Sequence, residues 1–373
     1  MSSGLNMSRR IRRSPYTNKV EQHGVRGFSV VNHMLLPKAF QPSVEEDYWH
    51  LRKHVQIWDV ATQRQVDIKG PDAARLVQWM TPRDLTQAKV GQCLYVPLVD
   101  EQGGMINDPV LLKLADDHFW LSIADSDVLL WAQGLALGAN FSVDICEPDV
   151  APLAVQGPKA EDLLADLFGE AIREIGFFNF GWIDFQGTSQ LIARSGYSRQ
   201  GGFEIYLQGG TESALADQLW DAIWEAGQAY NIAPGCPNLI ERIEGGLLSY
   251  GNEFTLADNP LECGLGSFCQ LDGDFDFIGK KALVNVRDSG IRRDMRGVLY
   301  GAEPLPNVTL PLPVVVDDKK VGQITSGIWS PRLNRNVGLS MIEREHWDAG
   351  SSVTVELGDG SQVSGEVSLL PFS

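Results

Sequence analysis

The stretch "IKGPDAARLVQWM", residues 68–80, decides the fold. It contains the end of a β-strand, a Gly-Pro corner and an α-helix, since Pro is favoured in the first turn of a helix. The same order of residue types returns in "VQGPKAEDLLADLF", residues 155–168. The repetition predicts two copies of one α+β unit.

The sequence around each corner extends this unit. Residues 93–124 read as strand, turn, strand, turn, strand, and residues 182–196 and 201–209 read as strands in the second copy. We therefore expect an approximate repeat at 59–150 and 151–235. From about Arg292 onward, short strands alternate with turn residues. This predicts a separate all-β unit over 292–373 and leaves 1–291 as the first region.

Helices are expected in three further places. Residues 43–58 begin with Ser43 and Glu46 at the spacing of a capping box and continue with apolar residues at helical intervals, so we predict a helix there. Residues 211–230 and an arginine-bearing segment at 237–251 are also predicted to be helical.

The composition excludes several classes of function. The 373 residues carry a formal net charge of −17, which would repel the phosphates of nucleic acid. The basic run "SRRIRR", residues 8–13, is not followed by an apolar targeting segment, and no apolar stretch reaches the ~18 residues of a membrane span. A cytoplasmic protein is predicted, with five reduced, structural cysteines.

Common catalytic motifs are missing. The sequence has no GxSxG, HExxH, GxGxxG or GxxxxGK[ST] motif, which argues against α/β-hydrolases, zinc proteases, dinucleotide oxidoreductases and P-loop enzymes. His50 and His54 are four residues apart, but no acid of an HExxH motif lies between them, so we expect solvated histidines and no metal.

Asp108, in "MINDPVLL" (residues 105–112), is the first candidate functional carboxylate. It follows a Gly-Gly turn and precedes four uncharged residues, so it lies at the mouth of a predicted buried strand. Burial raises a carboxyl pKa and hydrogen-bond donors lower it, which suits a group that binds a ligand or accepts a proton. A turn-capping aspartate explains the same pattern, and both interpretations stay open.

Glu204, in "GGFEIYL" (residues 201–207), is the second carboxylate. Period-2 alternation puts Glu204 and Tyr206 on one face of the strand and three apolar side chains on the other. If this face lines a pocket, the carboxylate can bind the paired donors of an aminopyrimidine edge. A solvated face is the equal alternative. Aromatic residues around both acids would suit a heteroaromatic or cationic ligand. They are Tyr95, Phe177, Phe178, Phe180, Trp182, Tyr197, Tyr206, Tyr250 and Trp329.

Eight blocks, spread in order over nearly the whole chain, resemble the tetrahydrofolate-dependent aminomethyltransferase family, the T-protein of glycine cleavage. Among them are "VGQCLYVPLVDEQGGMINDPVLLKL", "ARSGYSRQGGFEIYL", "LIERIEGGLLSYGNEF" and "VGQITSGIWSPRLNRNVGLSMI". The resemblance implies an α+β fold, with two ferredoxin-like folate-binding subdomains and a C-terminal antiparallel β-barrel around a central folate channel. It also implies tetrahydrofolate as co-substrate and no metal.

Segments such as "NHMLLP" and "GCPNLIERIEGGLLSYGNE" resemble the dimethylsulfoniopropionate demethylase branch more than the aminomethyltransferases proper. Three departures from the T-protein pattern favour that branch: Gln200 replaces an acid, Asn238 stands near the place of a usual arginine, and Ala124 replaces an asparagine. The resemblance implies methyl transfer from the sulfonium of dimethylsulfoniopropionate to N5 of tetrahydrofolate. The products are 5-methyltetrahydrofolate and 3-methylmercaptopropionate.

The matched motifs assign residues to this reaction. The resemblance implies that Asp108 and Glu204 hold the pterin and that Asp108 also favours proton loss from it. The other predicted folate contacts are Tyr95, Tyr197 and Trp329. The predicted walls of the sulfonium site, chosen by aromatic placement, are Tyr206, Phe178 and Trp182. The substrate carboxylate would bind Lys38, Arg64 or a backbone nest.

Other functions stay open at this point. A glycine-cleavage aminomethyltransferase, or a folate-dependent demethylase of a betaine or an aryl methyl ether, would share the folate site. A non-enzymatic folate-binding maintenance protein would carry a cysteine motif that "SYGNEFTLADNPLECGLG" lacks. The predicted partners are a small-molecule sulfonium substrate and folate, without nucleic acid or membrane, and a homodimer is an open alternative to a monomer.

Overall fold

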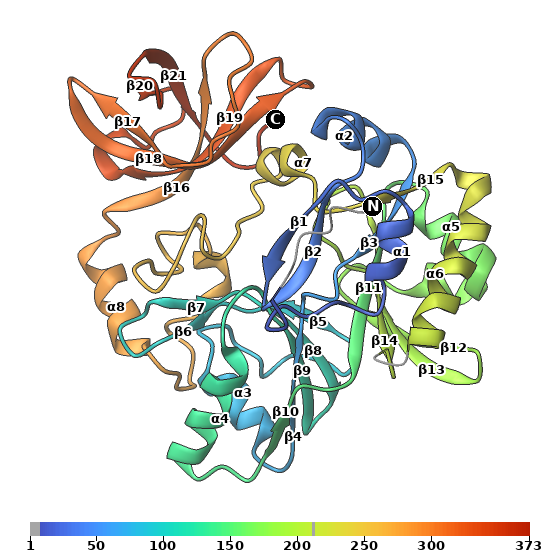
Figure 1. The fold of residues 1–373 in the computed structure, drawn as a ribbon. Helices are drawn as coiled ribbons and strands as arrows, with labels where there is room; N and C mark the ends of the chain where they lie inside the picture. Colours follow the sequence, from blue (N-terminus) through green and yellow to red (C-terminus); the bar gives the residue numbers. More distant parts are fainter. Residues whose placement is uncertain (1–7, 211–212) are drawn as a thin grey trace.

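The first large sheet is built from strands within residues 65–146. In the computed structural model, which describes residues 8–210 and 213–373, five antiparallel strands lie in the order β10-β4-β9-β8-β5 (Figure 1). Their bounds are β10 Asp144–Cys146, β4 Gln65–Lys69, β9 His118–Ser122, β8 Val110–Ala115 and β5 Cys93–Tyr95. Helices α3 (Ala73–Trp79) and α4 (Val128–Ala139) cover one face through a cluster of buried apolar side chains.

The second sheet has six strands in the order β12-β13-β14-β11-β3-β15, with β15 parallel to β3 and the other neighbours antiparallel. Their bounds are β12 Phe180–Phe185, β13 Thr188–Ala193, β14 Gly202–Gln208, β11 Val150–Gln156, β3 Val55–Asp59 and β15 Ile232–Gly235. Helices α5 (Ala160–Phe168) and α6 (Ser213–Gly227) cover its outer face. The start of the helix predicted over 211–230, Thr211 and Glu212, lies outside the described residues.

At each of the two Gly-Pro corners a strand leads into a helix. Strand β4 leads through Gly70 and Pro71 to α3, and β11 leads through Gly157 and Pro158 to α5. Both glycines have positive φ, +133° and +122°, and a Cβ at Gly157 would lie 2.4 Å from the backbone oxygen of His54. Each strand therefore turns past a neighbouring segment too closely for a side chain.

The two sheets face each other with their helix-free sides. The buried side chains between them include Cys93, Leu112 and Trp120 from the first sheet and Leu191 and Tyr206 from the second. We call these side chains, and those that point to the same side of both sheets, the inter-sheet layer. Helices α3 and α4 lie outside one sheet and α5 and α6 outside the other, so the order is helices, sheet, sheet, helices (Figure 1).

The helix predicted over 43–58 is confirmed as far as Lys53 and is wrong beyond it. Helix α2 spans Val44–Lys53, and the Ser43 hydroxyl caps it as predicted by accepting a hydrogen bond from the Glu46 amide at 3.1 Å. Residues Val55–Asp59 instead form β3, which is buried on both faces between β11 and β15. A strand buried on both faces lacks polar alternation, so its apolar residues fit a helical pattern equally well.

The C-terminal region is a closed antiparallel barrel in the order β16-β19-β18-β17-β20-β21 (Figure 1). Its strands are β16 Arg293–Tyr300, β19 Arg335–Glu343, β18 Lys319–Ser330, β17 Leu312–Val316, β20 Ser352–Glu356 and β21 Gln362–Ser368. Strand β16 pairs with both β19 and β21, which closes the barrel. The predicted α+β fold with a C-terminal antiparallel barrel is confirmed.

Smaller elements connect these parts. They are α1 Thr17–Gln22, β1 Gly27–Val31, β2 Met34–Ala39, β6 Leu98–Val99, β7 Met105–Asn107, α7 Leu239–Glu244 and α8 Lys280–Ser289. The arginine-bearing helix predicted at 237–251 thus forms over only the six residues of α7. Among 3₁₀ segments, Gln228–Tyr230 extends α6.

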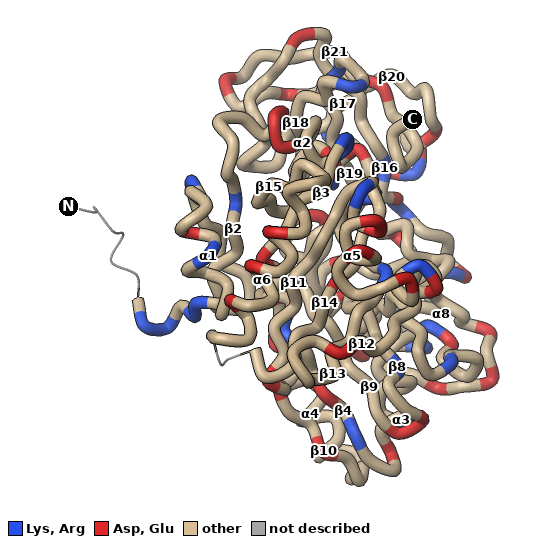
Figure 2. Tube along the Cα trace, turned by 90° about the vertical axis from the view of Figure 1, so that its right-hand side faces the viewer, with Lys and Arg blue, Asp and Glu red and all other residues tan. Residues whose placement is uncertain are grey.

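Acidic and basic residues are interspersed along the described chain and do not gather in one region (Figure 2). In the basic run at 8–13, Arg12 pairs with Glu147 and Arg13 pairs with Glu21, so acids neutralise part of it. Within residues 8–210 and 213–373, the helices are too short or too polar to cross a membrane.

Candidate functional site

Glu204 lies in a row of side chains that crosses the second sheet. Its cross-strand neighbours are Ala154 of β11 and Ala193 of β13. Beyond these two alanines lie Trp58 of β3 and Phe180 of β12. Since directly opposed Cβ atoms are about 4.5–5.5 Å apart, the small neighbours leave the carboxylate unobstructed on both sides.

The surroundings of Glu204 decide between the two interpretations of its face. The side chain is 5% exposed and points into the inter-sheet layer, so the solvated alternative is wrong. The Ser195 hydroxyl donates a hydrogen bond to one of its oxygens. Burial raises the Glu204 pKa, while the hydrogen bond from Ser195 lowers it. A buried carboxylate with few donors is suited to bind a ligand that brings its own.

Asp108 lies in the two-residue link between β7 and β8. The Tyr95 hydroxyl donates to Asp108 Oδ2 at 2.7 Å. The side chain of Asn107 bonds the local backbone, accepting from the amides of Asp108 and Ala124 at 3.0 Å each. Burial raises the pKa of Asp108 to about 7, against the lowering effect of the Tyr95 bond. The carboxyl is thus poised to titrate near neutral pH.

Strand β5 of the first sheet contacts the surroundings of both carboxylates. On the first sheet, Val110 and Leu112 contribute to the inter-sheet layer, and Asp108 lies in the two-residue link that precedes β8. Tyr95, two residues after Cys93 on β5, bonds Asp108 and packs with Phe268 against a neighbouring apolar cluster. Glu204, on the second sheet, lies close enough to Cys93 to affect its pKa, so the two carboxylates lie near residues of one strand that are two positions apart.

The predicted sulfonium walls occupy different depths of the same layer. Tyr206 is fully buried, and its hydroxyl has no hydrogen-bonding partner among the described residues. Phe178 is half-buried against the layer in a left-handed conformation, φ +55°, which is unusual for an aromatic residue and is held by hydrogen bonds to both sheets. Trp182 is 49% exposed on the edge strand β12. Its role stays a prediction.

The remaining predicted contacts lie farther along the chain. The Tyr197 hydroxyl donates to the backbone oxygen of Leu248 at 2.5 Å, and Asp108 is close enough to affect the Tyr197 pKa. Trp329 is half-buried on barrel strand β18. Of the candidates for the substrate carboxylate, Arg64 already pairs with Glu147 and Lys38 is exposed on β2.

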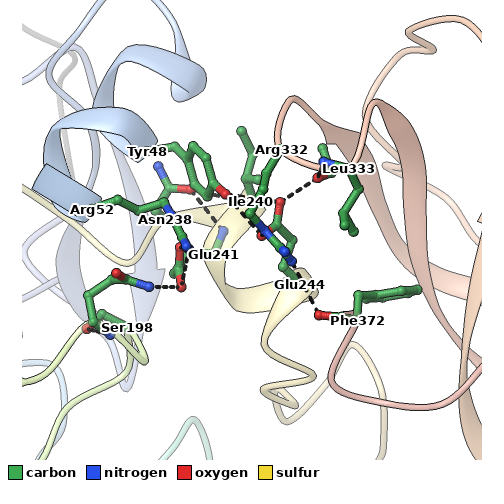
Figure 3. Close-up of polar contacts among 12 residues, drawn as sticks. Tyr48, Arg52, Ser198, Asn238, Ile240, Glu241, Glu244, Arg332, Leu333 and Phe372 are labelled. Carbon is green, nitrogen blue, oxygen red and sulfur yellow. Dashed lines mark hydrogen bonds and ion pairs between the residues drawn. The ribbon is translucent and has the colours of Figure 1, made fainter.

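Helix α7 carries buried charges whose role the sequence did not reveal (Figure 3). Glu241 accepts hydrogen bonds from Arg52 at 3.0 Å and from Gln200 at 2.6 Å. Glu244, three residues later, lies on the barrel side of Glu241 (Figure 3), where it accepts from Tyr48 at 3.0 Å and from barrel residues. The barrel donors are Ser330 at 2.5 Å and Arg332 at 2.9 Å.

The third charge of α7, Arg242, joins the helix to the barrel. Its guanidinium pairs with Glu253 at 2.8 Å and donates to the Ser326 hydroxyl at 2.6 Å. Both members of the ion pair are buried, with 8% and 0% of their side chains exposed. A signal was present in "LIERIE", since three charges interrupt an otherwise apolar helix.

Two departures from the T-protein pattern have structural explanations around α7. Asn238 caps the helix, its side-chain oxygen accepting from the amides of Ile240 and Glu241 at 3.0 and 3.2 Å. Gln200 donates its amide to Glu241, where an acid would place two carboxylates in contact.

The structure shows no metal centre in the described part of the chain, where no group of three or more His, Cys, Asp and Glu side chains is arranged for an ion. His50 and His54 lie with ring centroids 5.0 Å apart, and the second contacts Lys159 at 3.1 Å. All five cysteines are free.

Comparisons with known proteins agree with the fold and the matched motifs. Residues 16–273 match the GCVT N-terminal domain, and residues 300–373 match the glycine cleavage T-protein C-terminal barrel domain. The chain is 50% identical over 353 residues to dimethylsulfoniopropionate demethylase DmdA of Ruegeria pomeroyi, covering 95% of each chain. It is 31% identical over 327 residues to an aminomethyltransferase of Alkaliphilus metalliredigens, covering 86% of each. The crystal structure of glycine cleavage system aminomethyltransferase T from Bartonella henselae has a TM-score of 0.85 at 24% identity, covering 97% of this chain and 98% of that one.

Proposed function

The chain belongs to the glycine cleavage T-protein family, and on that premise we propose that it is a tetrahydrofolate-dependent demethylase of dimethylsulfoniopropionate. The reaction moves one methyl group from the sulfonium to N5 of tetrahydrofolate. It leaves 5-methyltetrahydrofolate and 3-methylmercaptopropionate and needs no oxidant.

One observation carries the proposal: two buried carboxylates, Asp108 and Glu204, lie near Tyr95 and Cys93 of the same strand, β5. Glu204 is buried between alanines and can accept the two parallel N–H donors of an aminopyrimidine edge. We assign Asp108, with its pKa near 7, to the opposite end of a bicyclic ring. The residues therefore fit a reduced pterin.

Tetrahydrofolate would supply the nucleophilic nitrogen, and the protein would hold the two reactants in position within a dry site. A neutral amine attacks a cation and a neutral sulfide leaves, so charge is dispersed in the transition state and a dry site is tolerated. Holding the reactants in line can account for ~7–11 kcal/mol of the barrier as an upper range. Asp108, when ionised, accepts the proton that the methylated nitrogen loses.

The aromatic side chains suit the methyl donor. Tyr206 and Phe178 lie in the inter-sheet layer beside Glu204, and Trp182 lies at its rim. Aromatic faces attract a desolvated cation by ~0.5–2 kcal/mol each. We assign the sulfonium to this wall and the pterin to the two carboxylates.

A substrate panel tests the proposal. Purified protein and tetrahydrofolate are incubated with dimethylsulfoniopropionate, with glycine betaine, or with an aminomethyl-lipoyl carrier, and the folate products are separated. The expected result is 5-methyltetrahydrofolate with the sulfonium compound alone. Formation of 5,10-methylenetetrahydrofolate from the carrier would assign the aminomethyltransferase activity instead, and methylation by betaine would assign a different donor.

A further inference from the structure

Trp120 is a polar group of the inter-sheet layer that the proposed reaction has not used. It lies on β9, paired with Leu112 of β8 on one side and Asp67 of β4 on the other. Its neighbours in sequence, Phe119 and Leu121, belong to the cluster under α3 and α4, so alternation turns Trp120 toward the second sheet.

The indole nitrogen of Trp120 is a buried donor without an acceptor. The residue is 4% exposed, and Nε1 has no hydrogen-bonding partner in the part of the chain that is described. Buried hydrogen-bond donors are nearly always paired, because a buried donor that forms no hydrogen bond still bears the full free-energy cost of its desolvation. The unpaired indole N–H therefore points to an acceptor that arrives with a ligand.

A second unpaired donor lies beside it. The Tyr206 ring is 6.3 Å from the Trp120 ring between centroids, and its hydroxyl also lacks a partner among the described residues. Ser122 and Glu204 are near enough to affect the Tyr206 pKa. Two unpaired donors thus lie in the layer into which Glu204 projects.

The chemistry of the layer selects the acceptor. A second carboxylate, such as that of the methyl donor, would be repelled by Glu204 at low dielectric. A neutral carbonyl is not repelled. On the pyrimidine ring of a pterin, the carbonyl is adjacent to the N–H that a carboxylate would bind. A hydrogen-bond donor next to Glu204 would therefore reach that carbonyl on the same edge of the ring.

We infer that the Trp120 indole donates a hydrogen bond to the 4-oxo group of the bound pterin, making Trp120 a cofactor-positioning and specificity residue. The inference rests on the proposed function. It deepens that function because the site then distinguishes a 4-oxo from a 4-amino pterin. An amino group at that position would place its own N–H donors opposite the indole N–H, and no hydrogen bond could form between them.

The test is a calorimetric titration of tetrahydrofolate and its 4-amino counterpart, reduced aminopterin, into wild-type protein and Trp120→Phe. Trp120→Phe should bind tetrahydrofolate about tenfold more weakly and should lose about the same factor of the preference for the 4-oxo ring. A second variant with benzothienylalanine at position 120, which keeps the shape and lacks the N–H, should behave like Trp120→Phe.

Trp131→Phe is the matched control. The Trp131 indole nitrogen is also buried without a partner among the described residues, but it lies on α4, on the far side of the first sheet. This variant should bind both compounds as the wild type does.

The outcomes separate the inference from the function it rests on. Wild-type protein that binds no tetrahydrofolate would overturn the proposed function. Wild-type protein that binds it, together with a Trp120→Phe variant of unchanged affinity and preference, would overturn only the inference. A variant that binds tetrahydrofolate normally but loses affinity for dimethylsulfoniopropionate would also overturn it, because Trp120 would then be a wall of the sulfonium site.

Discussion

Asp108 is the residue whose charge state should govern the rate. Its folded pKa is raised to about 7, and only the ionised carboxylate accepts a proton, so activity should rise as pH rises through about 7. Asp108→Asn should lower the rate of single-turnover methyl transfer by a factor of ~10 or more and abolish this rise. The measurement is the rate constant at pH values on both sides of neutrality.

Tyr95→Phe provides a directional control for that experiment. The Tyr95 hydrogen bond lowers the Asp108 pKa, so its removal should shift the midpoint of the pH profile upward while leaving the carboxylate in place. A midpoint that stays where it was, or an Asp108→Asn variant that keeps the full profile, would assign the titration to another group.

Glu204→Gln should weaken tetrahydrofolate binding about tenfold or more, because one charge-assisted hydrogen bond is worth ~1.5–3 kcal/mol. Isothermal calorimetry measures the affinity directly. Exposed Glu101 lies on a turn of the first region, and Glu101→Gln is the charge-matched control that should bind normally. Equal affinities for the two variants would remove Glu204 from the folate site.

The sequence predicted the face of Glu204 correctly but not its surroundings. Period-2 alternation places Glu204 and Tyr206 together, and this depends only on local geometry. Burial of that face depends on Trp120 and Cys93, which arrive from another sheet distant in sequence. No local pattern carries that information, so the sequence alone left the pocket and the solvated face as equal alternatives.

At the level of elements, the Gly-Pro corners should tolerate no side chain. Gly157→Ala would place Cβ 2.4 Å from the backbone oxygen of His54 at a φ of +122°, so we expect a loss of about 3 kcal/mol in the free energy of unfolding. Gly187→Ala, at φ +75° with open space around Cβ, should lose only about 1 kcal/mol. Urea unfolding measures both, and equal losses would mean that the close approach is not what requires glycine.

Helix α7 should depend strongly on its buried ion pair. Arg242→Ala leaves the fully buried Glu253 without its cation, which typically costs ~3–5 kcal/mol of stability. Arg287 forms exposed pairs with Asp272 and Asp288, and Arg287→Ala should change stability by less than ~0.5 kcal/mol. Chemical unfolding of the two variants checks the contrast, and a mild effect at Arg242 would show that Glu253 finds water or another partner.

Elements were predictable where the pattern was local and amphipathic. The Ser43 cap and the corner at Gly157 follow from residue types at fixed spacing. The strand Val55–Asp59 could not be predicted in this way, because both of its faces are buried by partners from elsewhere in the chain. Helix α7 was expected to be longer, and its length is set by Asn238 and Gly245 at its ends.

For the whole molecule, α7 should couple the barrel to the paired sheets in one cooperative unit. Glu244 bonds Tyr48 of α2 and Arg332 of the barrel at the same time. Scanning calorimetry of the wild type should therefore show a single transition, while Glu244→Ala combined with Arg332→Ala should split it into two. A single transition in the double variant would locate the coupling elsewhere, with Arg242 and Ser326 as the remaining link.

The family and the three-part fold were predictable from the sequence, because eight blocks and a repeated corner span most of the chain. Composition and periodicity could not predict that the two sheets face each other, because this arrangement depends on contacts between residues far apart in the chain. The predicted boundaries, 1–291 and 292–373, stay predictions, although β16 begins at Arg293.

The alanines beside Glu204 have a consequence for how such a protein can diverge. The side chains of Ala154 and Ala193 determine how much space lies on either side of Glu204, and they do not change its charge. A single codon change that replaces either alanine with a larger residue would narrow the space for a flat ligand. The hydrogen bonds of Glu204 to the polar edge of the ligand would stay the same. The width of the pocket and its hydrogen bonding to the ligand thus depend on different residues, so natural selection can adjust one while the other stays constant.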